Sequence, residues 1–107
     1  MTFYERNSKQ VPPSEQIVDA VSELLRINKI KPDSQFTLEF TASIVKHMYS
    51  ITVTHNEKSY VQNLYLNEDP FKSKPAIRSI ERALKKQFHF TQITEKESGT
   101  RKIHLSR

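Results

Sequence analysis

The chain is 107 residues long and carries 17 lysines and arginines against 12 aspartates and glutamates, a formal net charge of +5 at pH 7. This length suits one domain and is too short for two independent hydrophobic cores. There is no cysteine and only one glycine, Gly99, which excludes disulfides, thiolate zinc sites and the glycine-rich loops that cradle phosphates.

No apolar run in the sequence reaches the roughly 18 residues of a membrane span. The first segment, MTFYERNSKQVPP, lacks the apolar core of a signal peptide. Because the chain also has no cysteine, we expect it to act in the cytoplasm and not on a membrane.

Residues 1–13 show no hydrophobic periodicity and end in two prolines. We therefore expect a flexible N-terminal arm at residues 1–13 and a single α+β domain at residues 14–107. The domain begins with a helix that starts after Ser14, whose side chain suits an N-cap. This helix ends near Asn28, which suits a C-cap, and before Pro32, which cannot continue a helix. The apolar positions of this helix are Ile17, Val18, Val21, Leu24 and Leu25.

The middle of the chain alternates apolar and polar residues, which predicts three antiparallel strands over 35–41, 47–55 and 60–67. The residues expected on the buried face are Phe36, Leu38 and Phe40 in the first strand and Tyr49, Ile51 and Val53 in the second. The third strand has apolar residues on both faces, and the segment HNEKS supplies turn residues before it.

A second helix is predicted after the two prolines of NEDPFKSKP, with Ser73 or Lys74 before it, Pro75 in its first position and Phe88 near its end. Its apolar stripe consists of Ile77, Ile80, Leu84 and Phe88. The chain then forms a hairpin with strands near 89–94 and 101–105 and with Gly99 in the turn. We expect the order α-β-β-β-α-β-β, in an antiparallel sheet of about five strands with both helices on one face.

Most of the positive charge lies in the last third of the chain. Residues 1–69 have seven lysines and arginines against nine acids, whereas residues 70–107 have ten against three. On the second helix, four cations fall in one sector of about 100° beside the apolar stripe; they are Arg78, Arg82, Lys85 and Lys86. A basic face of this kind attracts polyanions. The residues predicted to contact nucleic-acid phosphates are Lys72, Lys74, Arg78, Arg82, Lys85 and Lys86, together with Arg101 and Lys102 on the final hairpin, which we expect to extend the same surface. The other interpretation is that these side chains only keep the helix solvated.

Residues 14–88 run α-β-β-β-α, and KSKPAIRSIERAL places lysines at the start of the second helix. This order and segment resemble double-stranded RNA-binding domains, in which such lysines hold phosphates across a groove. The resemblance implies that Lys72, Lys74 and Arg78 bind duplex RNA. The chain departs from that pattern because its strand loops lack glycine and Pro75 replaces a second consecutive lysine.

The full order of seven elements also resembles the core of type III secretion chaperones, which are dimers that bind partner polypeptides. This resemblance implies the alternative function, a protein-binding adaptor or a homodimer that uses an exposed strand or helix face. The chain differs from those chaperones in its basic charge and in ending with a hairpin.

No catalytic or metal-binding constellation is visible, so we expect no enzymatic activity, no cofactor and no metal. The four histidines, His47, His55, His89 and His104, are dispersed, although the last two could face each other across the final hairpin. The carboxylates of Glu68 and Asp69 precede a proline in a connection, where solvated acids are routine.

Three tyrosines fall on predicted strands, at positions 49, 60 and 65. Exposed rings on a sheet can stack on unpaired bases, which would favour single strands over a duplex. Packing in the core or across strands is the more common role of such residues.

Overall fold

The computed structural model describes residues 12–98 and 100–106, except for the side chains of residues 94–101. Its elements are, in chain order, α2 (Pro13–Ile27), β1 (Thr37–Ala42), β2 (Met48–His55), β3 (Lys58–Tyr65), α3 (Lys74–Phe88), β4 (Gln92–Ser98) and β5 (Thr100–Ser106). The predicted order α-β-β-β-α-β-β and the α+β fold class are therefore confirmed. The predicted arm lies, up to residue 11, outside the described residues, and so does the predicted turn residue Gly99.

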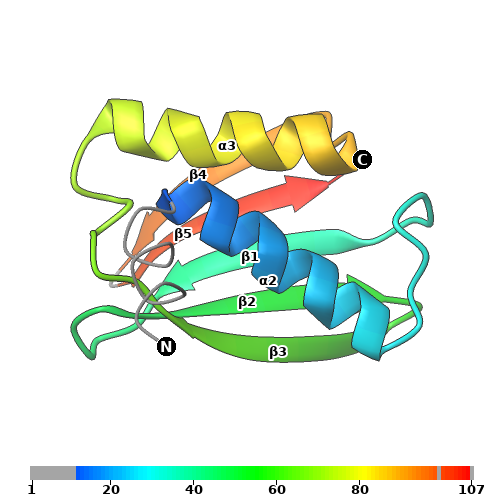
Figure 1. Cartoon of the computed structure of the whole chain (residues 1–107). Coiled ribbons are helices and arrows are strands. Elements are labelled where there is room, and N and C mark those ends of the chain that lie inside the picture. Colours follow the sequence, from blue (N-terminus) through cyan, green and yellow to red (C-terminus); the bar gives the residue numbers. More distant parts are fainter. Residues whose placement is uncertain (1–11, 99, 107) are drawn as a thin grey trace, which may run out of the picture.

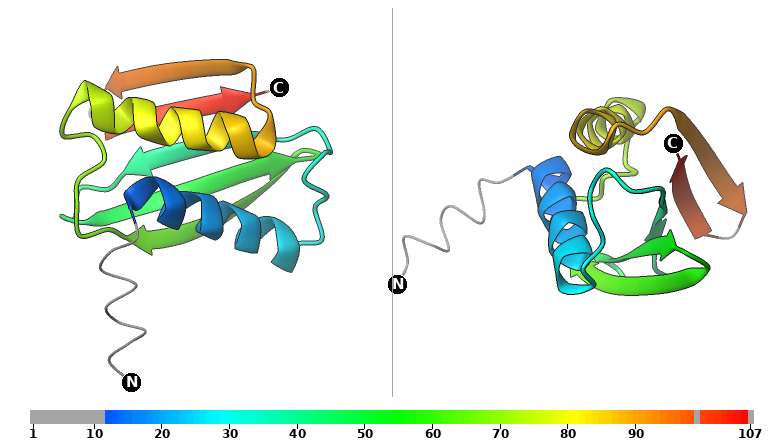
Figure 2. Two further views of the ribbon diagram at one scale, coloured as in Figure 1. Left: turned by 45° about the horizontal axis from the view of Figure 1, so that its top comes forward. Right: turned by 90° about the vertical axis from the view of Figure 1, so that its right-hand side faces the viewer.

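The five strands form one antiparallel sheet in the order β3-β2-β1-β5-β4, so the last strand of the chain lies beside the first. Helix α2 packs over β2 and β3 and also against α3. Helix α3 lies along the β5–β4 half of the sheet (Figure 1). Both helices therefore cover the same face of the sheet, as predicted, and leave the other face open (Figure 2).

The core lies between the two helices and the covered face of the sheet. The buried residues on the strands, or directly before β1 in the case of Phe36, include all six that the alternation predicts for the first two strands; they are Phe36, Leu38, Phe40, Tyr49, Ile51, Val53, Ile103 and Leu105. The ring of Phe40 stacks on those of Tyr49 and Phe71, in each case with 5.5 Å between ring centroids. Each such buried side chain stabilises the fold by about 1.5–3 kcal/mol, which fixes the helices on the sheet.

The start of α2 differs from the sequence prediction. Pro12 is the N-cap and Pro13 the first helical residue, so Ser14 lies inside the helix and its side chain is not the cap. Proline suits this first position because the N–H it lacks would have no partner within the helix. The predicted end is confirmed, since Asn28 is the C-cap and its Nδ2 donates to the backbone oxygen of Leu24 at 2.9 Å.

Helix α3 begins as predicted and is capped by Ser73, whose Oγ accepts a hydrogen bond from the backbone nitrogen of Ala76 at 3.3 Å. Lys74 is its first residue, so Pro75 occupies the second helical position and not the first, as the sequence predicted. The helix ends at His89, which has φ of 59° and donates its N–H to the Lys85 oxygen. The following strand therefore begins at Gln92 and not at residue 89.

Candidate nucleic-acid interface

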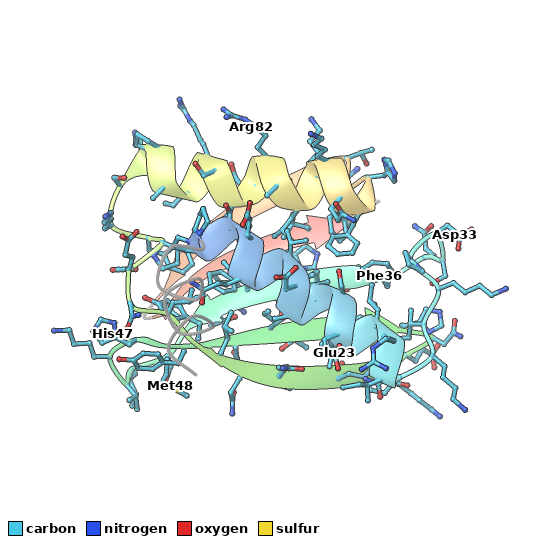
Figure 3. The ribbon with its side chains drawn as sticks, viewed as in Figure 1. Glu23, Asp33, Phe36, His47, Met48 and Arg82 are labelled. Atoms are coloured by element: carbon cyan, nitrogen blue, oxygen red, sulfur yellow. The ribbon has the colours of Figure 1, made fainter. Side chains whose placement is uncertain are left out.

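The exposed side of α3 follows from the side that it buries. Ile80, Leu84 and Phe88 are buried against the sheet. Positions four apart on a helix share a face, so Arg78 and Arg82 lie together on the side turned away from this stripe. The side chain of Arg82 points outward from the molecule, beyond both the helix and the sheet (Figure 3).

The basic ridge is defined here as the six cations on α3 and in the segment just before it. All six are exposed, and none forms an ion pair or hydrogen bond with another side chain within the described part of the protein; they are Lys72, Lys74, Arg78, Arg82, Lys85 and Lys86. Arg26 on α2 contrasts with them, because it forms an ion pair with Glu23 and holds the pKa of that carboxyl below its ordinary value by hydrogen bonding and by its charge. The cations of the ridge are therefore available to an anionic ligand.

The first turn of α3 has no acidic residue to complement the positive end of the helix dipole. Lys74 and Arg78 instead line a surface pocket of about 210 Å³ together with Ile77 and Glu81. Two cations beside a helix N-terminus favour an anion at this point, because the dipole and the side chains attract the same charge. Glu81 is the only acid in the sequence of α3.

The loop between β1 and β2, residues 43–47, lies at the same end of the sheet as the start of α3. It is tied to the connection after β3 by a hydrogen bond of 2.9 Å between His47 Nδ1 and the backbone oxygen of Leu66. Lys46 is exposed on this loop and lines a pocket with Asp69, three residues before Lys72. Sequence reasoning did not select Lys46, since only the fold brings this loop to the end of the sheet where the ridge begins.

Lys102 does not lie on the basic ridge, and the prediction that it extends that surface is wrong. Leu38 and Phe40 are buried under the helices, so Glu39 between them lies on the open face of the sheet. The Nζ atom of Lys102 is 3.8 Å from Glu39 Oε2, on that same face. The side chain of Arg101, the other predicted residue on this strand, lies outside the described residues.

The connection between β3 and α3 is held in place by hydrogen bonds that its sequence does not predict. Asp69 is half-buried, and its Oδ1 accepts hydrogen bonds from the Tyr49 hydroxyl at 3.1 Å and from the backbone nitrogen of Phe71 at 2.9 Å. The prediction of a solvated carboxylate is therefore wrong at this position, whereas Glu68 is exposed. These bonds fix the path of the chain into α3 and so place Lys72.

The open face of the sheet is mostly polar, with one exposed aromatic ring among the residues described. Its small polar residues on the first three strands are Thr37, Thr41, Ser50, Thr52, Thr54, Ser59 and Asn63. Tyr49 is buried on the opposite, covered face and Tyr60 is half-buried there against the core, which confirms the packing interpretation for both. Tyr65 is 57% exposed, and its ring contacts that of His47 with 5.5 Å between the ring centroids.

The histidines do not gather into a site. His104 faces Glu39 of β1, with 3.3 Å between its Nδ1 and the carboxylate Oε2, and lies opposite Thr94 in the β4–β5 register. His89 caps α3 and precedes β4, so the prediction that it faces His104 across the hairpin is wrong. Among the described side chains, no group of three histidines or acids is arranged to hold a metal ion.

The comparisons with known proteins leave the function to be argued from this geometry. No family model, curated protein or solved structure matches the chain. Within the described residues, neither helix has the length and apolar character needed to cross a membrane.

Proposed function

We propose that this protein is a non-enzymatic nucleic-acid-binding domain that contacts phosphates through the basic ridge. The observation that carries the proposal is the set of six exposed cations at α3 that have no ion-pair partner among the described residues. A cation that is already paired must lose its partner before it can contact a phosphate, whereas these cations bind at no such cost.

The length of the ridge suits a polyanion better than a small anion. Lys74 and Lys86 are twelve positions apart on α3, which corresponds to about 18 Å along the helix axis. Duplex nucleic acid presents one negative charge for about every 1.7 Å of its own axis, so a helix of this length lies within reach of several phosphates. A mononucleotide would meet only one end of the ridge.

Duplex RNA is the form of nucleic acid that we propose. The ridge is carried by a regular helix whose exposed side is dominated by lysine and arginine, which suits contacts to phosphates and groove shape more than readout of base edges. Lys46 on the β1–β2 loop adds a second basic point at the end of the sheet where α3 begins. Two separate basic elements can contact a duplex along one side, and we expect little dependence on base sequence.

The proposal also assigns the protein to the cytoplasm, in keeping with a chain that contains no cysteine. The alternative function, a protein-binding or self-associating module, is favoured by a different observation, the exposed edge of β3, and is compatible with RNA binding.

The proposed function is tested by fluorescence anisotropy with a labelled RNA duplex of mixed sequence. The double variant Arg78→Gln/Arg82→Gln removes two cations from the centre of the ridge and should weaken binding by about tenfold or more at low salt. The control, Lys29→Gln/Lys31→Gln, removes the same charge from the exposed connection between α2 and β1. We expect the control to bind within about twofold of the wild type, because exposed charges outside the contact are largely screened.

Equal weakening in the two variants would show that binding follows net charge and not the ridge, which would contradict the proposal. Failure of the wild type to bind duplex RNA, single-stranded RNA or DNA at low salt would also contradict it and would favour the protein-binding alternative.

A further inference from the structure

Among the residues that the structure describes, no strand pairs with the outer side of β3, so this edge of the sheet has backbone groups available for pairing. The β2–β3 turn is made by Asn56 and Glu57, with φ of 51° and 66°, values typical of a two-residue type I′ hairpin. In such a hairpin the pair that closes the turn, His55 and Lys58, is hydrogen-bonded, and alternate residues of β3 then bond to β2. The N–H and C=O groups of residues 59, 61, 63 and 65 therefore point away from the sheet.

The sequence of β3 lacks the usual features that keep an edge strand from pairing. Residues 58–65 contain no proline and a single charged residue, Lys58 at the first position. The strand at the other edge, β4, carries three consecutive charged residues at positions 95–97. Charges and prolines at an edge oppose association with another strand, so β3 is the edge suited to accept one.

Exposed apolar residues are concentrated at the same edge. Val61 is 61% exposed and Tyr65 is 57% exposed, both on the open face of β3. Ile44 is 95% exposed in the β1–β2 loop, where it lines a surface pocket of about 420 Å³ that reaches Asn63 of β3. A run of exposed apolar side chains beside unpaired backbone groups is the signature of an interaction site.

We propose that β3 pairs antiparallel with β3 of a second copy of this chain, about a two-fold axis that passes through Asn63. The two five-stranded sheets then form one continuous sheet. In this register Val61 lies opposite Tyr65 of the second copy, and the outward backbone groups of the two strands form about six hydrogen bonds. A β-branched residue opposite an aromatic one is a stabilising cross-strand pair, and symmetry forms this pair twice.

Charge complementarity favours a second copy over another partner. The same register brings Lys58 toward Glu68 of the second copy at both ends of the paired strands, and both side chains are exposed in the single chain. The basic ridge lies on α3, along the β5–β4 half of the sheet (Figure 1), and β3 is at the opposite edge. Pairing through β3 therefore keeps the two basic ridges apart and leaves both free to bind RNA.

The axis is tested by oxidative crosslinking of single-cysteine variants, because the natural chain has no cysteine to confuse the result. In the proposed register, Asn63 of each copy is about 5.5 Å from its counterpart between Cα atoms, within the range that a disulfide spans. The two copies of Val61 are offset by about 13 Å along the strands. Asn63→Cys should therefore form a disulfide-linked dimer readily, and Val61→Cys should form much less.

Sedimentation velocity over a range of protein concentrations gives the independent measurement. The wild type should pass from monomer to dimer as concentration rises, and Val61→Lys should weaken dimerisation by about tenfold or more because it places an unpaired charge opposite Tyr65 of the second copy. Thr37→Lys, which adds the same charge on β1 away from the edge, should leave dimerisation unchanged. Lys58→Glu should weaken the dimer, and Lys58→Glu combined with Glu68→Lys should restore it.

A wild type that stays monomeric at every concentration would overturn the proposal, as expected if β3 receives a different polypeptide. A dimer that Val61→Lys leaves unchanged, or that Val61→Cys crosslinks better than Asn63→Cys, would place the interface or its axis elsewhere and would also overturn it. RNA binding by the Val61→Lys variant is measured in parallel, so failure of the dimer is distinguished from failure of the basic ridge.

Discussion

The Nζ atom of Lys102 lies 3.8 Å from Glu39 Oε2, on the face of the sheet that the helices leave open. Lys102 and Arg82 therefore differ in both face and pairing, although they carry the same charge. Arg82 is exposed on the ridge, and Lys102 is half-buried beside an acid.

This difference predicts unequal effects of two matched substitutions on RNA binding. Arg82→Gln should weaken binding to an RNA duplex by about fivefold, the loss expected for one phosphate contact, and Lys102→Gln should change it by less than about twofold. Anisotropy titrations of the two variants at one salt concentration give the comparison. A larger effect of Lys102→Gln would move the interface to the open face of the sheet.

The basic ridge should be separable from the stability of the fold. Replacing Arg78, Arg82 and Lys86 with glutamine should leave the melting temperature nearly unchanged, because exposed helical charges contribute only about a few tenths of a kcal/mol each. Ile80 is 1% exposed, so Ile80→Ala should lower the free energy of unfolding by about 2–5 kcal/mol. Thermal and urea unfolding followed by circular dichroism measure both effects. Marked destabilisation by the triple change would mean that these side chains are structural.

Tyr65 provides the test between duplex and single-stranded RNA. It is exposed on the open face, whereas Tyr49 is buried and its hydroxyl is bonded to Asp69. We expect the wild type to prefer the duplex in a competition between duplex and single strand of matched sequence. Tyr65→Ala should leave that preference unchanged. A single-strand preference that Tyr65→Ala abolishes would show base stacking on the sheet and would contradict the duplex proposal.

Hydrophobic periodicity was sufficient to predict the elements of this fold but not the face on which each charge lies. The alternation around Leu38 and around Ile51 identified β1, β2 and their buried sides, because side-chain direction in a strand depends only on local parity. The stripe ending at Phe88 identified α3 in the same way. A one-face pattern also required the helices to share one side of the sheet.

The remaining features depend on contacts between residues distant in the sequence or on single backbone conformations. Lys102 meets Glu39 only because β5 inserts beside β1, a pairing that no local pattern encodes. Asp69 has a structural role only because the Tyr49 hydroxyl reaches it. His89 delays the next strand by adopting a left-handed conformation, which histidine adopts only occasionally.

The salt dependence of RNA binding is the most direct measure of phosphate contact by α3, because phosphate contacts release counterions in proportion to their number. For the wild type, the logarithm of the association constant should fall linearly with the logarithm of salt concentration, with a slope of about −3 to −5 if four to six phosphates are contacted. Arg78→Gln/Arg82→Gln should reduce the steepness of that slope by about two units, and Lys29→Gln/Lys31→Gln should leave it unchanged. A slope near zero, or one that the ridge variant does not alter, would contradict phosphate binding by α3.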